Sequence, residues 1–172
     1  MAVQEYRDPL LTKLIKMLEA NGPKELVGHY VQGDVLAPNR SELPVVSIAR
    51  QGTIVKSGGT MQDVHTSAIV MAVIYDWTQD LDQSFDLVRG STALYRLIEE
   101  RNDNYSAKEN TLVYALRAFQ KLDDNVFISI RDEGLRVDYG LGWEKRGSNI
   151  FSVEGILRFN IELTQEKPNW QP

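Results

Sequence analysis

The stretch Thr66-Ser-Ala-Ile-Val-Met-Ala-Val-Ile-Tyr-Asp-Trp77 carries the clearest strand pattern in the chain. Its odd-numbered positions form one apolar side: Ile69, Met71, Val73 and Tyr75. Its even-numbered positions form a second apolar side: Val70, Ala72 and Ile74. A strand that is apolar on both sides is typical of a sheet interior covered by other elements. We therefore expect a central strand that is covered on both faces.

The segment before this strand predicts a β-hairpin followed by a loop. Residues 45–55 contain two β-rich runs separated by Gln51-Gly52, a pair typical of a tight turn. Ser57-Gly58-Gly59-Thr60 then predicts a flexible loop, because glycine adopts backbone conformations that are closed to other residues. The loop 57–63 has one large apolar residue, Met61, so it gains little from packing in a lone subunit. We expect it either to order against a partner or to remain an ordinary exposed turn.

Three helices are predicted. Asp8 is a good N-cap and Pro9 suits the first helical position, so a helix begins there and ends at Asn21-Gly22. Apolar residues at helical spacing predict a second helix over residues 87–98 and a third over residues 110–121.

The last third of the chain predicts strands. Residues 126–130 and 135–141 alternate between apolar and polar, and residues 153–163 do so for longer than the five or six residues of a typical strand. A strand of this length can present a free edge to another chain. Residues 165–172 predict a short polar tail.

This order of elements predicts an α+β protein, because runs of strands are separated from runs of helices. We expect a mixed or antiparallel β-sheet with helices packed on it and a C-terminal β-meander. The 172 residues suit a single domain over residues 1–172, in which residues 1–22 contain the N-terminal helix.

Composition argues against several kinds of chemistry. The chain has no cysteine and two histidines, so it offers no disulfide, no thiolate zinc site and no cysteine nucleophile. Its formal net charge of −5 argues against wrapping nucleic acid, which requires clustered positive charge. The acidic beginning and the absence of a long apolar run predict neither a signal peptide nor a membrane span. We expect no enzyme activity, no catalytic residue, no cofactor and no metal ion.

The few motif-like segments lack the residues that their chemistry requires. Gly142–Ser148 has the glycine spacing of a phosphate loop but no lysine after the second glycine, and it lies between two predicted strands. Asp80-x-Asp82 and Asp123-Asp124 are the tightest acidic groups, and neither has the further ligands of a calcium loop. His29 and His65 are each interpreted as surface or hydrogen-bonded histidines, with a role as a general base kept as the alternative.

In this order the elements resemble the tail terminator, or tail-completion, proteins of long-tailed bacteriophages, of the lambda-like minor tail protein U type. An irregular stretch leads into Leu43-Pro44-Val-Val-Ser-Ile48, and the loop with Gly58-Gly59 follows. The central strand ends at Tyr75-Asp-Trp77, before the helix of residues 87–98. Near the end, Phe151-Ser-Val-Glu-Gly-Ile-Leu-Arg-Phe159 places a glycine before an Ile-x-Arg-Phe pattern. The resemblance spans nearly the whole chain.

The resemblance implies a structural virion protein that forms a ring, usually of six subunits, on the end of the tail tube. Such a ring stops tube polymerisation and offers an attachment surface to the neck of the filled head. The implied partners are other copies of the chain, the tail tube protein and neck or head-completion proteins. Genomic DNA would pass through the lumen without specific binding, and the protein would assemble in the host cytoplasm without contacting a membrane. The residues we expect at subunit contacts are Gly58, Gly59, Met61, Ile156, Arg158 and Phe159.

Three alternatives remain at the level of sequence. The nearest is a neck or head-completion connector ring of the same virion, which shares the size, the charge and the lack of catalytic motifs. The second is a small cytoplasmic enzyme with a dispersed site built from His29, His65 or acidic loops. The third is a cytoplasmic adaptor unrelated to phage.

Overall fold

The structure is a computed structural model, and it describes residues 7–33, 40–59, 61–76, 88–130, 134–140, 144–146 and 150–167. The described helices are α1 (Pro9–Asn21), α2 (Val88–Glu99) and α3 (Leu112–Ala118), with short 3-10 turns at Lys24–Leu26 and Arg40–Glu42. The described strands are β1 (Tyr30–Gln32), β2 (Val45–Ser57), β3 (Gln62–Asp76), β4 (Lys121–Asp123), β5 (Val126–Ser129), β6 (Arg136–Tyr139), β7 (Glu144–Arg146) and β8 (Ile150–Glu166).

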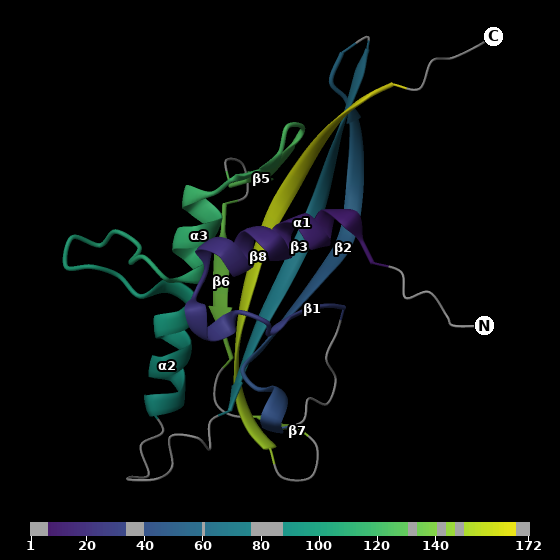
Figure 1. The fold of residues 1–172 in the computed structure, drawn as a ribbon. Helices are drawn as coiled ribbons and strands as arrows, with labels where there is room; N and C mark the ends of the chain where they lie inside the picture. Colours follow the sequence, from purple (N-terminus) through teal and green to yellow (C-terminus); the bar gives the residue numbers. More distant parts are fainter. Residues whose placement is uncertain are drawn as a thin grey trace, which may run out of the picture.

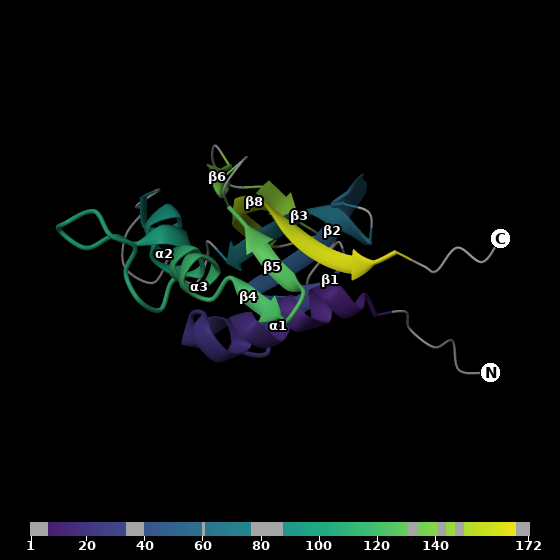
Figure 2. The same ribbon diagram turned by 90° about the horizontal axis from the view of Figure 1, so that it is seen from above.

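The described strands form one eight-stranded sheet, and the described helices pack on one of its faces (Figures 1 and 2). Its main path runs β1-β2-β3-β8-β5-β4, and β6 and β7 also pair with β8. The sheet is mixed, because β1 is parallel to β2 whereas β3 and β8 are antiparallel to their partners. This arrangement confirms the predicted α+β class with strands at the C-terminal end.

The centre of the sheet is the pairing of β3 with β8. It runs without interruption from Gln62 opposite Glu166 to Asp76 opposite Ser152. On its other side β8 pairs successively with β7, β6 and β5. The strands that were expected to form a meander therefore each pair with β8. The expectation of a free edge on the last strand is wrong for most of its length, because β8 has a neighbour on both sides.

The hairpin turn predicted at Gln51-Gly52 is also wrong. Strand β2 passes straight through these residues, and its register with β3 shifts between Arg50 and Gly52. The strand thus absorbs an extra residue as a bulge. The turn that reverses the chain lies instead between Ser57 and Gln62. Glycine is compatible with both a turn and a bulge, and the long pairing of β2 with β3 on both sides of this point selects the bulge.

Helix α1 begins as predicted, and Asp8 Oδ1 accepts a hydrogen bond from the Leu10 N–H at 2.9 Å. Helix α3 is shorter than predicted, because Thr111 caps its start and Lys121 already belongs to β4. Several predicted positions lie outside the described residues, among them residue 60, Trp77, residue 87, residue 141 and the tail residues 168–172. Within the described ranges no helix is both long and apolar enough to cross a membrane.

The core lies between the sheet and the helices. Ile69, Met71 and Val73 of β3 point into it and are almost fully buried. Strand β8 contributes alternate residues to the same face, as its sequence pattern predicts: Val153, Gly155, Leu157, Phe159 and Ile161. From the helices come Leu11, Leu14, Leu18, Leu94, Ile98, Leu112 and Leu116. The hydrophobic effect on this face accounts for the position of the three helices.

The second face of β3 is less covered than predicted. Ile74 is buried in a small cluster with Leu43 and Val45, but Val70 and Ala72 are only half-buried and Ala68 is exposed. These residues are small or β-branched, so an apolar pattern on this side does not require a second layer of helices.

Gly155 marks a close approach of α2 to the sheet. A Cβ atom at this position would lie 2.3 Å from Ile98 Cδ1 and 3.4 Å from Leu94 Cδ2. Both side chains belong to the buried core. The glycine of the Gly-Ile-Leu-Arg-Phe pattern is therefore explained by helix packing.

We predict that Gly155→Ala destabilises the protein by about 1–3 kcal/mol, because the core must make room for a methyl group. Ile98→Val removes the atom that this methyl group would meet. In the Ile98→Val background, Gly155→Ala should therefore cost much less, as measured by urea unfolding of the four proteins of the cycle.

Gly52→Ala is the matched control. Gly52 also lies in a strand, and a Cβ atom there would meet nothing within 4 Å. Its effect should stay within about 0.5 kcal/mol. An equal cost of Gly155→Ala in both backgrounds would show that the contact with Ile98 is not the cause.

Candidate functional site

The β2–β3 hairpin projects beyond the body of the protein, at the top of Figure 1. We call residues 52–66 the arm. All residues of β2 from Arg50 onward are exposed. Three large apolar side chains on the arm are more than half exposed: Ile54 (63%), Val55 (56%) and Met61 (72%). Ile54 and Val55 are neighbours in β2 and lie on opposite faces of the arm, so each face carries an exposed apolar side chain that a partner can cover.

The outer edge of β2 is open along the arm. Strand β1 pairs with β2 only over Val46–Ile48. In the described part of the chain no strand pairs with the outer edge of β2 from Arg50 to Ser57. An open edge presents unpaired backbone N–H and C=O groups to a strand of another chain. Lys56 lies on this edge, and an edge lysine disfavours unspecific pairing.

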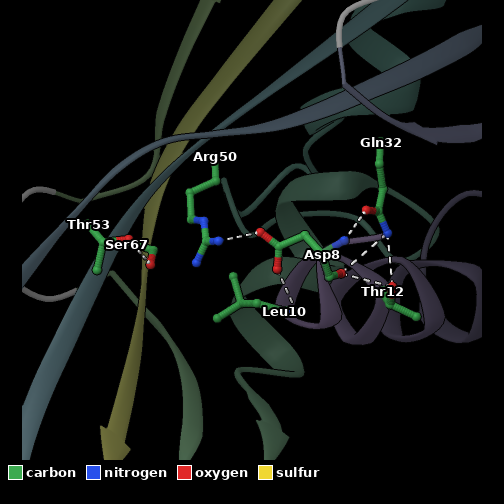
Figure 3. Close-up of polar contacts among 7 residues, drawn as sticks. All are labelled: Asp8, Leu10, Thr12, Gln32, Arg50, Thr53 and Ser67. Carbon is green, nitrogen blue, oxygen red and sulfur yellow. Dashed lines mark hydrogen bonds and ion pairs between the residues drawn. The ribbon is translucent and has the colours of Figure 1, made fainter. Parts of the chain in front are cut away.

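A polar cluster anchors the base of the arm to α1 (Figure 3). Arg50 Nη2 lies 2.8 Å from Asp8 Oδ2. The Asp8 N–H donates to Gln32 Oε1 at 2.9 Å, and the Thr12 hydroxyl donates to the Asp8 carbonyl at 2.9 Å. Asp8 is almost fully buried, so it needs these partners. A single residue thus connects three elements: the Asp8 carboxylate contacts the helix start and Arg50 at the base of the arm, and the Asp8 N–H contacts Gln32 of β1.

Next to this anchor, β2 and β3 are linked by a side-chain hydrogen bond. Thr53 Oγ1 and Ser67 Oγ lie 3.0 Å apart on opposite strands (Figure 3). Ser67 is buried, whereas the residues of β2 beside it are exposed. The arm therefore leaves the core at this pair.

The tip of the arm is a tethered turn. The Gly58 N–H donates to the Gln62 carbonyl at 3.0 Å, and Gly59 has a φ of 142° that favours glycine. Lys167 Nζ donates to Ser57 Oγ and to the Gly59 carbonyl, each at 2.8 Å. Lys167 was predicted to belong to a polar tail. It lies just after β8 and holds the turn in place.

The predicted contact residues divide into two groups, and the first lies at the tip of the arm. Gly58, Gly59 and Met61 all occupy the turn between β2 and β3. Each of them is exposed, so all three are accessible to a partner.

The second predicted group does not form one surface with the tip. Ile156 and Arg158 lie on the outer face of β8, and Ile156 is ten residues, or about 33 Å, from the end of β8 beside the tip. The Arg158 guanidinium is paired with the Asp138 carboxylate of β6. Phe159 points the opposite way and is only 3% exposed in the core. In this subunit Phe159 is a core residue.

The two histidines do not share a site. The His29 carbonyl accepts a hydrogen bond from Val46, whereas His65 pairs with Val55. These partners are nine residues apart along β2, which corresponds to about 30 Å. Asp80-x-Asp82 and Gly142 lie outside the described residues. A single catalytic site containing both histidines is therefore not formed in this fold.

A hollow of about 430 Å³ lies between α1 and β1 and is lined in part by Lys16, Glu19 and Tyr30. The Tyr30 hydroxyl is buried without a hydrogen-bond partner among the described residues. Burial raises the pKa of Tyr30 well above its usual range, and the nearby Glu19 carboxylate adds to this. The phenol therefore stays neutral and cannot serve as a general base near neutral pH.

Burial likewise raises the pKa of Tyr139, and the hydrogen bond from its hydroxyl to Glu99 Oε1 (2.9 Å) raises it further. This contact connects β6 to α2. Lys121 lowers the pKa of Asp124 by a hydrogen bond on the protein surface. Both interactions are structural.

We predict that Asp8→Ala destabilises the protein by about 2 kcal/mol, because it removes the helix cap and leaves Arg50 without its partner. Asp8→Asn keeps an acceptor for the Leu10 N–H and loses only the charge. It should lower the free energy of unfolding, measured in urea, by about 1 kcal/mol or less, since the Arg50 side chain is 36% exposed.

The control is Asp123→Asn, which breaks a more exposed pair with Lys13 and should change stability by less than about 0.5 kcal/mol. Equal effects of the two Asp8 variants would contradict a separate contribution from the cap.

We predict that Lys167→Met increases amide hydrogen exchange several-fold over residues 57–63, because the turn loses its tether. Lys56→Met removes the same charge from the same arm. Lys56 has no carboxylate within ion-pair distance among the described residues. In Lys56→Met, amide hydrogen exchange over residues 57–63 should therefore stay as in the wild type. Unchanged exchange in both variants would show that the Lys167 contacts do not hold the turn.

Comparison with known proteins adds no family assignment. No family model matches the chain, and no curated protein is significantly similar to it.

Proposed function

We propose that the chain is a structural virion protein of a tailed bacteriophage, a tail terminator that assembles into a ring on the end of the tail tube. The observation that supports this best is the arm, which combines an open strand edge with exposed Ile54, Val55 and Met61. The resemblance in the order of elements supplies the phage context.

The arm is costly for a lone subunit. Strand β8 supports β3 along the whole arm, up to Gln62 opposite Glu166, so the cost lies in the exposed apolar side chains and the open edge of β2. Burying one large apolar side chain contributes about 1.5–3 kcal/mol, so covering the three exposed side chains of the arm would stabilise an assembly considerably. Such an arm is well suited to reach a neighbouring subunit.

Charge is compatible with a ring through which DNA passes. Each copy carries a formal net charge of −5, so a ring would repel phosphate and let the duplex move without sticking. The proposed partners are further copies, the tail tube protein, and neck or head-completion proteins. The proposed location is the tail and neck of the virion.

We predict that Val55→Asp abolishes ring formation while leaving the subunit folded, because the side chain is 56% exposed in the free subunit. The matched control is Val27→Asp, which changes a 50% exposed valine away from the arm. Rings should be counted by negative-stain electron microscopy of protein mixed with tail tubes, and the subunit mass should be followed by light scattering.

The wild type and Val27→Asp should both form rings on tube ends. A wild type that stays monomeric even with tubes would contradict the proposal. Imaging of virions assembled without the protein separates the closest alternative: over-long tails support a terminator, whereas filled heads beside normal tails support a neck connector.

A further inference from the structure

The connection between α2 and α3, residues 101–110, is an ordered loop that extends from the helix layer, on the left of Figure 1. We call it the Tyr105 loop. The Asn102 N–H donates to the Ser106 carbonyl at 3.0 Å, and the Tyr105 N–H donates to the Asn102 carbonyl at 2.8 Å. Arg101 Nη1 donates to the Tyr105 carbonyl at 3.1 Å. These bonds hold the tip of the loop in one conformation before any partner arrives.

Tyr105 occupies a strained position at this tip. Its φ is 64°, in the left-handed region that glycine and asparagine favour in such turns. Its side chain is 82% exposed, the most exposed large apolar residue in the described chain. A bulky residue kept at a conformational cost and displayed to solvent points to a role in binding.

An open groove of about 510 Å³ lies between the Tyr105 loop and α3. Its lining includes Tyr105, Tyr114 and Arg117. Tyr114 packs edge-to-face on Phe119, with ring centroids 6.4 Å apart. Arg117 is exposed, and no carboxylate of the described chain lies within ion-pair distance of its guanidinium. Tyrosine and arginine are the residues that contribute most often to protein interfaces. The groove therefore suits an apolar side chain that is accompanied by a carboxylate.

The tip of the arm offers this combination. Met61 is 72% exposed, and the Lys167 N–H donates to its carbonyl at 3.0 Å, which places the end of β8 beside it. Glu166 of β8 pairs with Gln62 and is exposed, without a cation in ion-pair distance among the described residues. Methionine sulfur makes favourable contacts with aromatic rings, and a carboxylate forms strong hydrogen bonds with arginine.

The Tyr105 loop and the arm tip lie far apart on the subunit: the loop is on the left in both views, and the tip is at the top of Figure 1 and on the right of Figure 2. One chain therefore cannot bring them together. Two different, complementary surfaces that lie far apart are what a head-to-tail assembly requires. We propose that the groove of one copy receives the arm tip of the next, with Met61 against Tyr105 and Tyr114, and Glu166 paired with Arg117. This inference rests on the proposed ring.

Charge reversal tests the contact. Arg117→Glu and Glu166→Arg should each weaken self-association about tenfold or more, as measured by sedimentation on tube-free protein and by ring counts with tail tubes. The double variant restores opposite charges and should return association to within a few-fold of the wild type. Arg96→Glu is the matched control, because Arg96 is also an exposed arginine in the last turn of a helix but lies outside the groove.

A second variant removes the aromatic side chain without straining the loop. Tyr105→Gly should keep or raise the thermal stability of the subunit, because glycine adopts a φ of 64° freely. It should nevertheless weaken association about tenfold. A lower association together with unchanged stability separates a binding role from a structural one.

The outcomes distinguish this inference from the proposed function. If the wild type and the Arg117, Glu166 and Tyr105 variants form rings equally well, the proposed groove contact is wrong, whereas the proposed ring is supported. If the double reversal stays as weak as the single ones, Arg117 and Glu166 do not pair. If the wild type never associates, with or without tubes, both the proposed ring and the proposed groove contact are contradicted.

Discussion

The uninterrupted pairing of β3 with β8 is the constraint on which the rest of the structure depends. It fixes the alternation of both strands, so that Ile69 and Phe159 face the helices together while Val70 and Arg158 face outward. It also gives β5, β6 and β7 a single edge on which to pair, and it carries the arm beyond the core. A slip of one residue would turn every core residue of the strand to solvent, which makes this register strongly specified.

The helix layer is joined to this sheet by two kinds of contact. Close packing at Gly155 sets the position of α2, because any side chain there would meet Ile98. The position of α1 depends on a polar contact, since Asp8 caps the helix and pairs with Arg50 at the base of the arm. The polar contact fixes the orientation of the helix start, because a buried carboxylate is satisfied in few geometries.

Much of the fold could be predicted from local patterns. The period-two alternation of β8, the Asp8-Pro9 helix start and the apolar β3 all follow from short-range preferences. The predictions that were wrong or missing concern contacts between residues that are distant in sequence. Gln51-Gly52 has the local chemistry of a turn, and only its neighbour β3 shows that it is a bulge. Lys167 and Arg50 have no local pattern that indicates their contacts with Ser57 and Asp8.

The two candidate contact surfaces also differ in how clearly the local sequence indicates them. The glycines of the arm tip were visible in the sequence as a loop, whereas the Tyr105 loop carried only the weak signal of the turn formers Asn102-Asp103-Asn104. Both features work against the stability of a lone subunit: the arm leaves apolar side chains in water, and Tyr105 occupies a conformation suited to glycine. Local costs of this kind are typical of surfaces whose compensating contacts come from another chain. Because the two features lie far apart on the subunit (Figures 1 and 2), one contact between neighbours can offset both.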